Sequence, residues 1–232
     1  MANHLDLEEQ EQLDELKAFW SRYGNAITWA LIAVLAGFAG WNGYQYWQRS
    51  QSTQAAALFD EVDRAAKAGD TAKVERAFSD IKDKFARTAF AQQAGLLAAK
   101  TLFDKGNLDA SKAALTWVAA QSSDEGYQPV ARLRLAAVLM DAKSYDEAMQ
   151  QLSGSFPKEF EPLVADRKGD VFALQGKKTE AVAQYKAAYT GLDERDDYRR
   201  IVEVKLNSLG VDPRPVAPVV AAASPVTVEI KK

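Results

Sequence analysis

Reactive side chains are nearly missing from this chain of 232 residues, which contains no cysteine and a single histidine, His4. Without cysteine there is no disulfide framework and no thiolate chemistry, and one histidine leaves little for general-base or zinc sites. The phosphate-binding patterns G-x-x-x-x-G-K-[ST] and G-x-G-x-x-G do not occur. The composition therefore predicts a protein that is not an enzyme and has no cofactor or metal. An unfamiliar Ser-Lys or carboxylate-pair site is the alternative that stays open.

Charge is missing from one segment, residues 23–48, although acidic and basic side chains are frequent on both sides of it. About 20 mostly apolar residues suffice for a helix to cross roughly 30 Å of hydrocarbon. Aromatic side chains gather at both margins of the run, with Trp20 and Tyr23 at one end and Tyr46 and Trp47 at the other. Such belts are typical of the two membrane interfaces, so we predict a single transmembrane helix at 23–48.

Two other interpretations of this run are a cleaved secretory signal and a buried helix of a soluble domain. A signal would need a short basic leader, whereas residues 1–22 carry six acids and two bases. A helix that is apolar all round would need a larger core than this chain can build. Lys17 and Arg22 precede the run and Arg49 alone follows it closely, which favours a cytoplasmic N-terminus for the acidic leader 1–22 by the positive-inside rule.

Residues 49–210 repeat a pattern of helix, tight turn and second helix. A small or β-branched residue marks each second helix at intervals of 37, 37 and 33 residues, at Val74, Ser111, Ala148 and Ala181. A turn residue precedes each marker, at Gly69, Gly106, Lys143 and Gly176. Paired-helix repeats of the tetratricopeptide type have a period of about 34 residues. We therefore predict an all-α fold, in which a single N-terminal transmembrane helix precedes a tetratricopeptide-like, right-handed helical-hairpin solenoid with four helix pairs.

The residues twelve positions before each marker are expected to be the points where paired helices touch, namely Val62, Ala99, Ala136 and Gly169. Residues 194–209 form a further amphipathic pattern that is expected to cap the stack, because a terminal repeat needs a face that tolerates water. Residues 211–232 hold four of the seven prolines among alanine and valine. This composition buries too little surface to offset its ordering entropy, so we predict a disordered or extended tail.

The repeat region carries no net charge. Removing the leader's six acids and two bases and the tail's two acids and three bases from the totals of 32 and 29 leaves 24 of each sign in the rest. A surface without net positive charge attracts polyanions weakly. Nucleic acid is therefore excluded as an expected ligand.

A binding site in such a solenoid is expected on the concave wall built by the first helix of each pair. The predicted lining of this polypeptide-binding groove is Phe59, Leu96, Lys100, Phe103, Val130, Leu133 and Met140. Five aspartates are expected nearby and would make the C-terminal half of the groove acidic: Asp63, Asp104, Asp141, Asp166 and Asp170. An exposed apolar strip suits extended or unfolded polypeptide. The alternative is that these side chains pack against a neighbouring helix or against the tail.

Small residues recur at intervals of three and four along the predicted span, at Ala33, Ala36, Gly37, Gly40 and Gly43. Such a face allows another membrane helix to approach closely. We therefore expect a contact with a second copy, through the span or the repeats, or with a different membrane protein. Glycine is also frequent in membrane helices in general.

Three segments in this order resemble a known family: LKAFWSRYGNAI at the end of the leader, GWNGYQYWQRSQ at the end of the span, and ALFDEV before the repeats. The chain resembles the YfgM-like ancillary subunits of the SecYEG translocon over about residues 10–210. The aromatic and glycine pattern around Trp41 and Trp47 is the most specific part of this resemblance, whereas the tail is not typical of the family.

The resemblance implies a single-pass protein of the inner membrane with a short cytoplasmic N-terminus and a periplasmic repeat domain. It implies two partners, the SecYEG translocon and a membrane-anchored periplasmic chaperone of the prolyl-isomerase type, and unfolded exported polypeptides as clients. The expected function is therefore chaperone-like and not catalytic. An envelope scaffold whose repeats hold a defined folded partner or peptide is the alternative.

Overall fold

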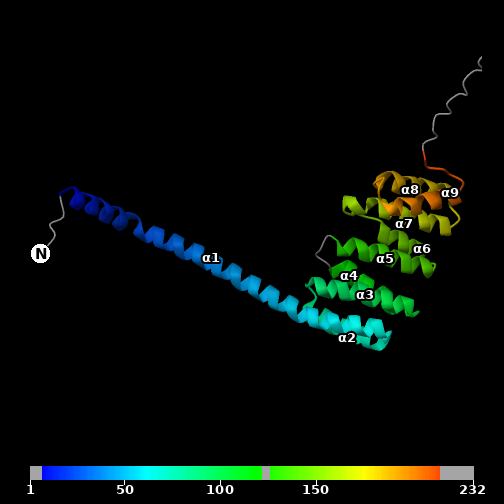
Figure 1. Ribbon diagram of the computed structural model, residues 1–232, viewed down its shortest axis with the longest axis horizontal. Helices are drawn as coiled ribbons and strands as arrows, with labels where there is room; N and C mark the ends of the chain where they lie inside the picture. The colour runs from blue at the N-terminus through cyan, green and yellow to red at the C-terminus, as the bar shows by residue number, and fades with distance from the viewer. Residues whose placement is uncertain (1–6, 122–125, 215–232) are drawn as a thin grey trace, which may run out of the picture.

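The computed structural model describes residues 7–121 and 126–214, with side chains from residue 11 onward, and every regular element in these ranges is a helix (Figure 1). The prediction of an all-α fold is therefore confirmed. Part of the predicted leader and most of the predicted tail, residues 1–6 and 215–232, lie outside the described residues. The elements in chain order are α1 Leu7–Ala68, α2 Thr71–Phe85, α3 Ala89–Asp104, α4 Leu108–Gln121, α5 Tyr127–Asp141, α6 Tyr145–Leu152, the 3-10 turn η1 Lys158–Phe160, α7 Glu161–Leu174, α8 Lys178–Gly191 and α9 Asp197–Ser208.

Helix α1 is a rod of 62 residues that projects from the stack formed by the other helices (Figure 1). Its N-terminal part includes a stretch that is long and apolar enough to cross a membrane, and that stretch is almost entirely unburied. The predicted boundaries after residues 22 and 48 both fall inside this helix. The leader, the span and the first helix of the first repeat are thus continuous in the backbone, and the division between them stays a prediction.

Polar side chains within the span bond to the helix itself. The Thr28 hydroxyl donates to the carbonyl of Gly24 at 2.8 Å, and the Asn42 amide donates to the carbonyl of Phe38 at 2.9 Å. In a bilayer, where water cannot satisfy polar groups, such bonds to the preceding turn lower the cost of a polar side chain. The interior polar residues are therefore compatible with a transmembrane helix.

The remaining helices alternate as hairpins, and their tight turns share one geometry. The four predicted turn residues all have positive φ: 67° at Gly69, 80° at Gly106, 60° at Lys143 and 74° at Gly176. In each turn, the residue after the one with positive φ donates its N–H to the carbonyl five positions earlier. In the second turn, for example, the N–H of Asn107 donates to the carbonyl of Leu102 at 2.8 Å. This is the Schellman arrangement, which satisfies the last carbonyls of a helix and requires a left-handed residue. The predicted repeat register is confirmed.

The predicted contact points lie in the core between paired helices. Val62 and Ala136 are fully buried, and Ala99 accepts a 2.8 Å hydrogen bond from the hydroxyl of the marker Ser111. At Gly169 a Cβ atom would lie 2.5 Å from the ring of Tyr185. Small residues are needed here because the two backbones approach closely.

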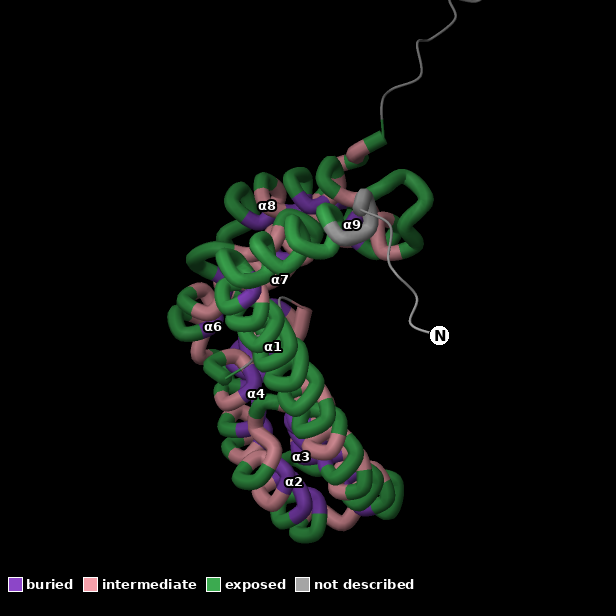
Figure 2. Tube along the Cα trace, turned by 90° about the vertical axis from the view of Figure 1, so that its left-hand side faces the viewer, coloured by how far each residue is buried: buried purple, intermediate pink, exposed green. Residues whose placement is uncertain are grey.

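The stack curves into an arc (Figure 2). Helices α4, α6 and α8 lie on its outer side, whereas α3 and α7 lie on its inner side. One buried cluster runs from α1 to α7, and a smaller one joins α8 to α9. Helix α9 ends the stack where the cap was expected, which confirms that prediction. The first helix of each pair therefore builds the concave wall.

Candidate functional site: a pocket in the concave wall

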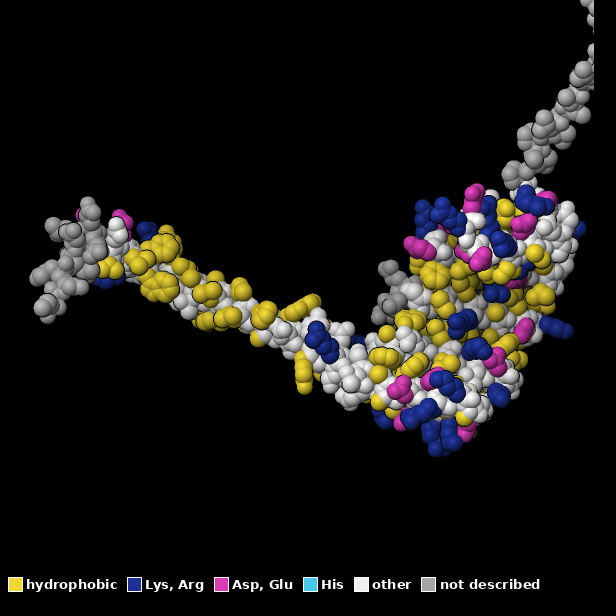
Figure 3. Space-filling model, viewed as in Figure 1, with side chains coloured by type: hydrophobic (Ala, Val, Ile, Leu, Met, Phe, Trp, Pro, Cys, Tyr) yellow, Lys and Arg dark blue, Asp and Glu magenta, His cyan; other side chains and the backbone are white. Residues whose placement is uncertain are grey.

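A pocket of about 290 Å³ opens where α3 and α5 separate in the concave wall. The two helices are joined mainly through α4, which packs on both of them. The pocket is lined by Ala99, Lys100 and Phe103 of α3, Ser111 and Leu115 of α4, and Arg134, Ala137 and Val138 of α5. Its interior is largely apolar and its rim carries two basic side chains. On the molecular face seen in Figure 3, apolar side chains likewise gather between charged ones on the repeat domain.

Two of the seven predicted groove residues line this pocket, Lys100 and Phe103. Lys100 is exposed and forms an ion pair with Asp104, one turn further along α3. Phe103 is half-buried and packs against the core. A flat apolar side chain beside an exposed ammonium group offers a site for an apolar residue with a neighbouring carboxylate.

The other five predicted residues do not line this pocket. Leu96 and Met140 are 9% and 7% exposed and belong to the core, so little of either side chain is accessible from the groove. Phe59 is half-buried and packs against Phe90 with ring centroids 5.9 Å apart. Val130 and Leu133 are half-buried against the core. Hydrophobic periodicity marks the inner face of each helix, but it does not distinguish a core side chain from one that borders solvent.

The pocket also includes residues that the groove prediction missed. Three of them belong to α5, namely Arg134, Ala137 and Val138. Whether they face the same pocket as the residues of α3 depends on the spacing between the two helices. Arg134 directly follows the predicted Leu133, but a basic residue gives no periodic signal. Among the described residues, no carboxylate lies within ion-pair distance of Arg134. Its charge is therefore available to a ligand.

The prediction of an acidic C-terminal half of the groove is wrong at Asp166 and Asp170. Asp166 is fully buried, and the Lys205 ammonium group donates to both of its carboxylate oxygens at 2.8 Å and to Asp170 at 2.7 Å. The Tyr198 hydroxyl adds a bond to Asp166 at 2.7 Å, and the Tyr185 hydroxyl adds one to Asp170 at 2.8 Å. A cation from α9 thus bridges the two carboxylates of α7, and Arg167 of α7 supplies a second cation 3.2 Å from Asp170. Sequence spacing could not show this, because Lys205 lies 39 residues from Asp166.

This cluster shifts the acid–base behaviour of its tyrosines. Burial, together with the charge of Asp170 and the bond to it, raises the pKa of Tyr185 well above its usual range. Burial and the hydrogen bond to Asp166 raise the pKa of Tyr198 in the same way. Both hydroxyls act as donors to carboxylates and stay protonated at neutral pH. The cluster joins α9 to α7 and leaves no free nucleophile.

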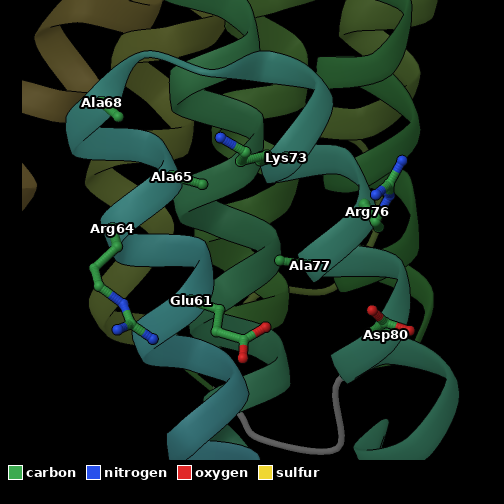
Figure 4. Close-up of a pocket in the computed structure, with 8 residues that line it drawn as sticks. All are labelled: Glu61, Arg64, Ala65, Ala68, Lys73, Arg76, Ala77 and Asp80. Carbon is green, nitrogen blue, oxygen red and sulfur yellow. The ribbon is translucent and has the colours of Figure 1, made fainter.

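A larger pocket of about 420 Å³ lies between α1 and α2 at the N-terminal end of the stack (Figure 4). Three alanines and five charged residues line it, with Glu61 and Asp80 against Arg64, Lys73 and Arg76. Lys73 is already paired with Asp70 at 2.9 Å. The lining has no apolar side chain larger than alanine and mixes three bases with two acids, so it is a weaker candidate than the pocket between α3 and α5. No group of three metal-ligating side chains occurs within residues 7–121 and 126–214.

The small residues of the span are exposed in the structure. No heavy atom lies within 4 Å of the position that a Cβ atom would take at Gly37, Gly40 or Gly43, and Ala33 and Ala36 are exposed as well. Nearly all of the strongly exposed large apolar side chains among the described residues belong to α1; the exceptions are Leu174, Ile201 and Val204. The predicted packing face is thus open, and its use as a contact stays a prediction.

Residues 17–211 match a family described as tetratricopeptide repeat-like domain. An ancillary SecYEG translocon subunit of Neisseria gonorrhoeae is 34% identical over 210 residues, which are 90% of this chain and 100% of that protein. The protein of the same name from Haemophilus influenzae is 28% identical over 88% of this chain and 98% of its own length. The one from Escherichia coli is 25% identical over 88% and 97%.

Proposed function

This chain belongs to the tetratricopeptide repeat-like, YfgM-like family of ancillary SecYEG translocon subunits, and we propose that it is a membrane-anchored binding protein that associates with the translocon and assists newly exported polypeptides. In this proposal the span lies in the inner membrane, the leader is cytoplasmic and the repeat domain is periplasmic. The protein binds and hands on its clients without catalysis. A membrane-anchored chaperone of the prolyl-isomerase type is its proposed partner.

The continuity of α1 supports a role next to a membrane channel. The first buried residue of the repeat domain is Ala55, so residues 49–54 separate the domain from the predicted span by about 9 Å at a rise of 1.5 Å per residue. Neither glycine nor proline occurs between Gly43 and Gly69, and sharp kinks arise mainly at such residues. The repeat domain is therefore held close to the membrane by a straight connection. Tethering of this kind raises the local concentration of the binding site.

The pocket between α3 and α5 is the observation that carries the binding role. It combines an apolar interior with Phe103 and two exposed basic groups at its rim. Ligand sites in proteins are typically concave and apolar, with a few polar groups that orient the ligand. An extended chain lying along the wall would place one apolar side chain in the pocket. Because the remaining wall is only half-buried apolar surface, contacts on either side would be weak and would tolerate many sequences.

Photo-crosslinking in living cells tests this function. A photo-reactive residue at Phe103 is expected to capture newly exported chains, whereas the same residue at Thr116, which is exposed on α4, serves as a matched control. Capture of many different chains from Phe103 alone supports the proposal. Capture of one defined folded envelope protein would instead favour the scaffold, and equal capture from both positions would refute a role for the pocket.

Protease accessibility tests the orientation separately. In spheroplasts, added protease is expected to remove residues C-terminal to the span while the leader stays protected. Protection of the repeat domain until lysis would contradict a periplasmic location. A photo-reactive residue at Gly40 reports on helix contacts in the membrane, and it is expected to capture a translocon subunit, the chaperone or a second copy.

A further inference from the structure

The pocket between α3 and α5 has room for one large side chain. Its volume of about 290 Å³ exceeds the roughly 150 Å³ of a cavity that holds benzene, and it lies at the lower end of the range of about 300–1,000 Å³ for sites that take whole small molecules. Ala99 and Ala137 leave this space open, because each lines it with nothing larger than a methyl group. The size of the pocket therefore fits a single large side chain rather than a complete small-molecule ligand.

The floor of the pocket offers no free hydrogen-bond donor. Leu115 and Val138 are apolar and buried. Apart from the two basic residues at the rim, Ser111 is the polar side chain of the lining, and its hydroxyl already donates to the carbonyl of Ala99 at 2.8 Å. A polar group that is buried without a partner costs free energy. The floor therefore favours an apolar occupant over an amide or a carboxylate.

Two groups that line the pocket have no partner of the kind they prefer. Among the described residues, no second aromatic ring pairs with Phe103 and no cation lies over its ring. Within the same ranges, no carboxylate lies within ion-pair distance of Arg134, whereas Lys100 is paired with Asp104. Phe103 is half-buried and Arg134 is exposed. Both are therefore accessible to an occupant of the pocket.

An aromatic ring complements both of these groups at once. Rings pair with one another edge to face or offset, and the face of a ring attracts a cation within about 6 Å of its centroid. Two arginines of the repeat domain already make the second contact, with Arg132 over Phe156 at 3.9 Å and Arg199 over Tyr189 at 4.2 Å. An aliphatic side chain of the same size would fill the pocket but would make neither contact.

We propose that the pocket between α3 and α5 selects aromatic side chains of extended polypeptides, with the ring packed against Phe103 and its face toward the guanidinium group of Arg134. These two residues then determine specificity, while the floor supplies the apolar contact that any large side chain would use. A client is recognised by an exposed phenylalanine, tyrosine or tryptophan rather than by apolar character in general. This inference names the substrate class of the proposed function and rests on it.

Disulfide trapping measures this selectivity, because the chain has no cysteine of its own. The full-length variant Asp141→Cys, reconstituted in lipid nanodiscs, carries a thiol at an exposed position one turn beyond Val138. The variant Ala183→Cys carries one at an exposed position of α8 and is the control. Each variant is equilibrated under mildly reducing conditions with equal amounts of three peptides, acetyl-Cys-Gly-X-amide, in which X is phenylalanine, cyclohexylalanine or serine. Mass spectrometry of the adducts gives their ratios directly.

We expect the phenylalanine adduct to exceed the cyclohexylalanine adduct about tenfold at position 141 and to equal it at position 183. Cyclohexylalanine buries at least as much apolar surface, so burial alone predicts no excess for the aromatic ring. A tenfold ratio corresponds to about 1.4 kcal/mol, which one ring pair and one exposed cation contact supply together. Equal amounts of these two adducts at position 141, both above serine, would overturn the aromatic selectivity and leave the proposed function intact. Equal amounts of all three would refute the pocket as a binding site, and with it the proposed function.

Substitutions at the pocket test the roles of its two specificity residues. In the Asp141→Cys background, Arg134→Gln and Phe103→Leu are each expected to lower the ratio of phenylalanine to cyclohexylalanine adduct about threefold, whereas Arg134→Lys retains the cation and most of the ratio. The matched control Arg195→Gln removes an exposed arginine in the turn before α9 and is expected to leave the ratio unchanged. Because Arg134 is exposed, its replacement does not disturb the core, and an unchanged ratio in Arg134→Gln would overturn the proposal.

Discussion

Replacement of Lys205 by methionine is expected to release α9 from the end of the stack. The ammonium group of Lys205 makes three bonds of 2.7–2.8 Å to Asp166 and Asp170. Methionine retains most of the aliphatic volume but leaves two neighbouring carboxylates without their common cation. Removal of one partner from a buried ion pair typically costs about 3–5 kcal/mol. Lys205 is 25% exposed while Asp166 is fully buried, so water relieves part of the loss and we expect about 3 kcal/mol.

Hydrogen exchange of the full-length protein in detergent measures this effect locally. Since α9 is the terminal element, its opening does not require the other helices to unfold. A loss of 3 kcal/mol corresponds to about a 100-fold rise in exchange for the amides of residues 197–208. The matched control is Lys84→Met, which removes an exposed pair with Asp80 and is expected to change stability by less than about 1 kcal/mol.

A double substitution separates charge from packing. The pair of changes Asp166→Asn and Lys205→Met removes the buried carboxylate together with its cation, while Asp170 keeps its pair with Arg167 at 3.2 Å. An asparagine at position 166 still accepts the bond from Tyr198. We expect exchange in α9 to return most of the way to the parent rate. The reasoning is refuted if Lys205→Met leaves exchange within about threefold of the parent, since the pair would then contribute no more than an exposed one.

Three further predictions concern a repeat turn, a close contact between paired helices and the two buried tyrosines. Lys143→Gly removes a side chain from a residue with φ of 60° and is expected to raise the free energy of unfolding by about 0.5–1 kcal/mol in thermal denaturation, whereas Gly106→Lys should lower it. Gly169→Ala places a methyl group 2.5 Å from the ring of Tyr185. It is expected to lower the melting temperature, because the cost of overpacking, about 1–3 kcal/mol, exceeds the gain in helix propensity. An unchanged melting temperature would contradict the close contact. The pKa values of Tyr185 and Tyr198 are raised in the folded state, so just above pH 10 only the unfolded chain releases these two protons. The free energy of unfolding should therefore fall as the pH rises, by at most about 1.4 kcal/mol per pH unit for each tyrosine. Tyr198→Phe should reduce this slope between pH 10 and 11 in urea denaturation, and an unaltered slope would refute the assignment.

The repeat register could be predicted from the sequence because its constraints are local. A residue with positive φ must follow each first helix, and a small residue must lie where the paired helices touch. Gly69, Gly106 and Gly176 report the first requirement directly. Lys143 shows that spacing carries the information even where the residue type is unfavourable. Hydrophobicity and length predict the span in the same way, since both are properties of one segment.

The candidate site could be predicted only in part, because it depends on how far apart neighbouring repeats lie. The alternation that selected Phe103 and Lys100 also selected Leu96 and Met140, which the structure places in the core. A pocket forms where α3 and α5 separate, and no pattern within either helix encodes that separation. The same limit explains the error at Asp166. Its partner, Lys205, belongs to the capping helix, and a solenoid register derived from the four repeats does not include the cap.

Helix α1 runs without a break from the predicted span into the first repeat of the domain that holds the pocket. Since no break separates the predicted span from the first repeat, a rotation of the span about its own axis turns the whole concave wall by the same angle. A partner that packs on the glycine face of the span would therefore also determine which way the pocket faces. An articulated anchor would bring the pocket close to the membrane but leave its direction undetermined. The continuous helix fixes both, and the proposed handling of exported chains would depend on both.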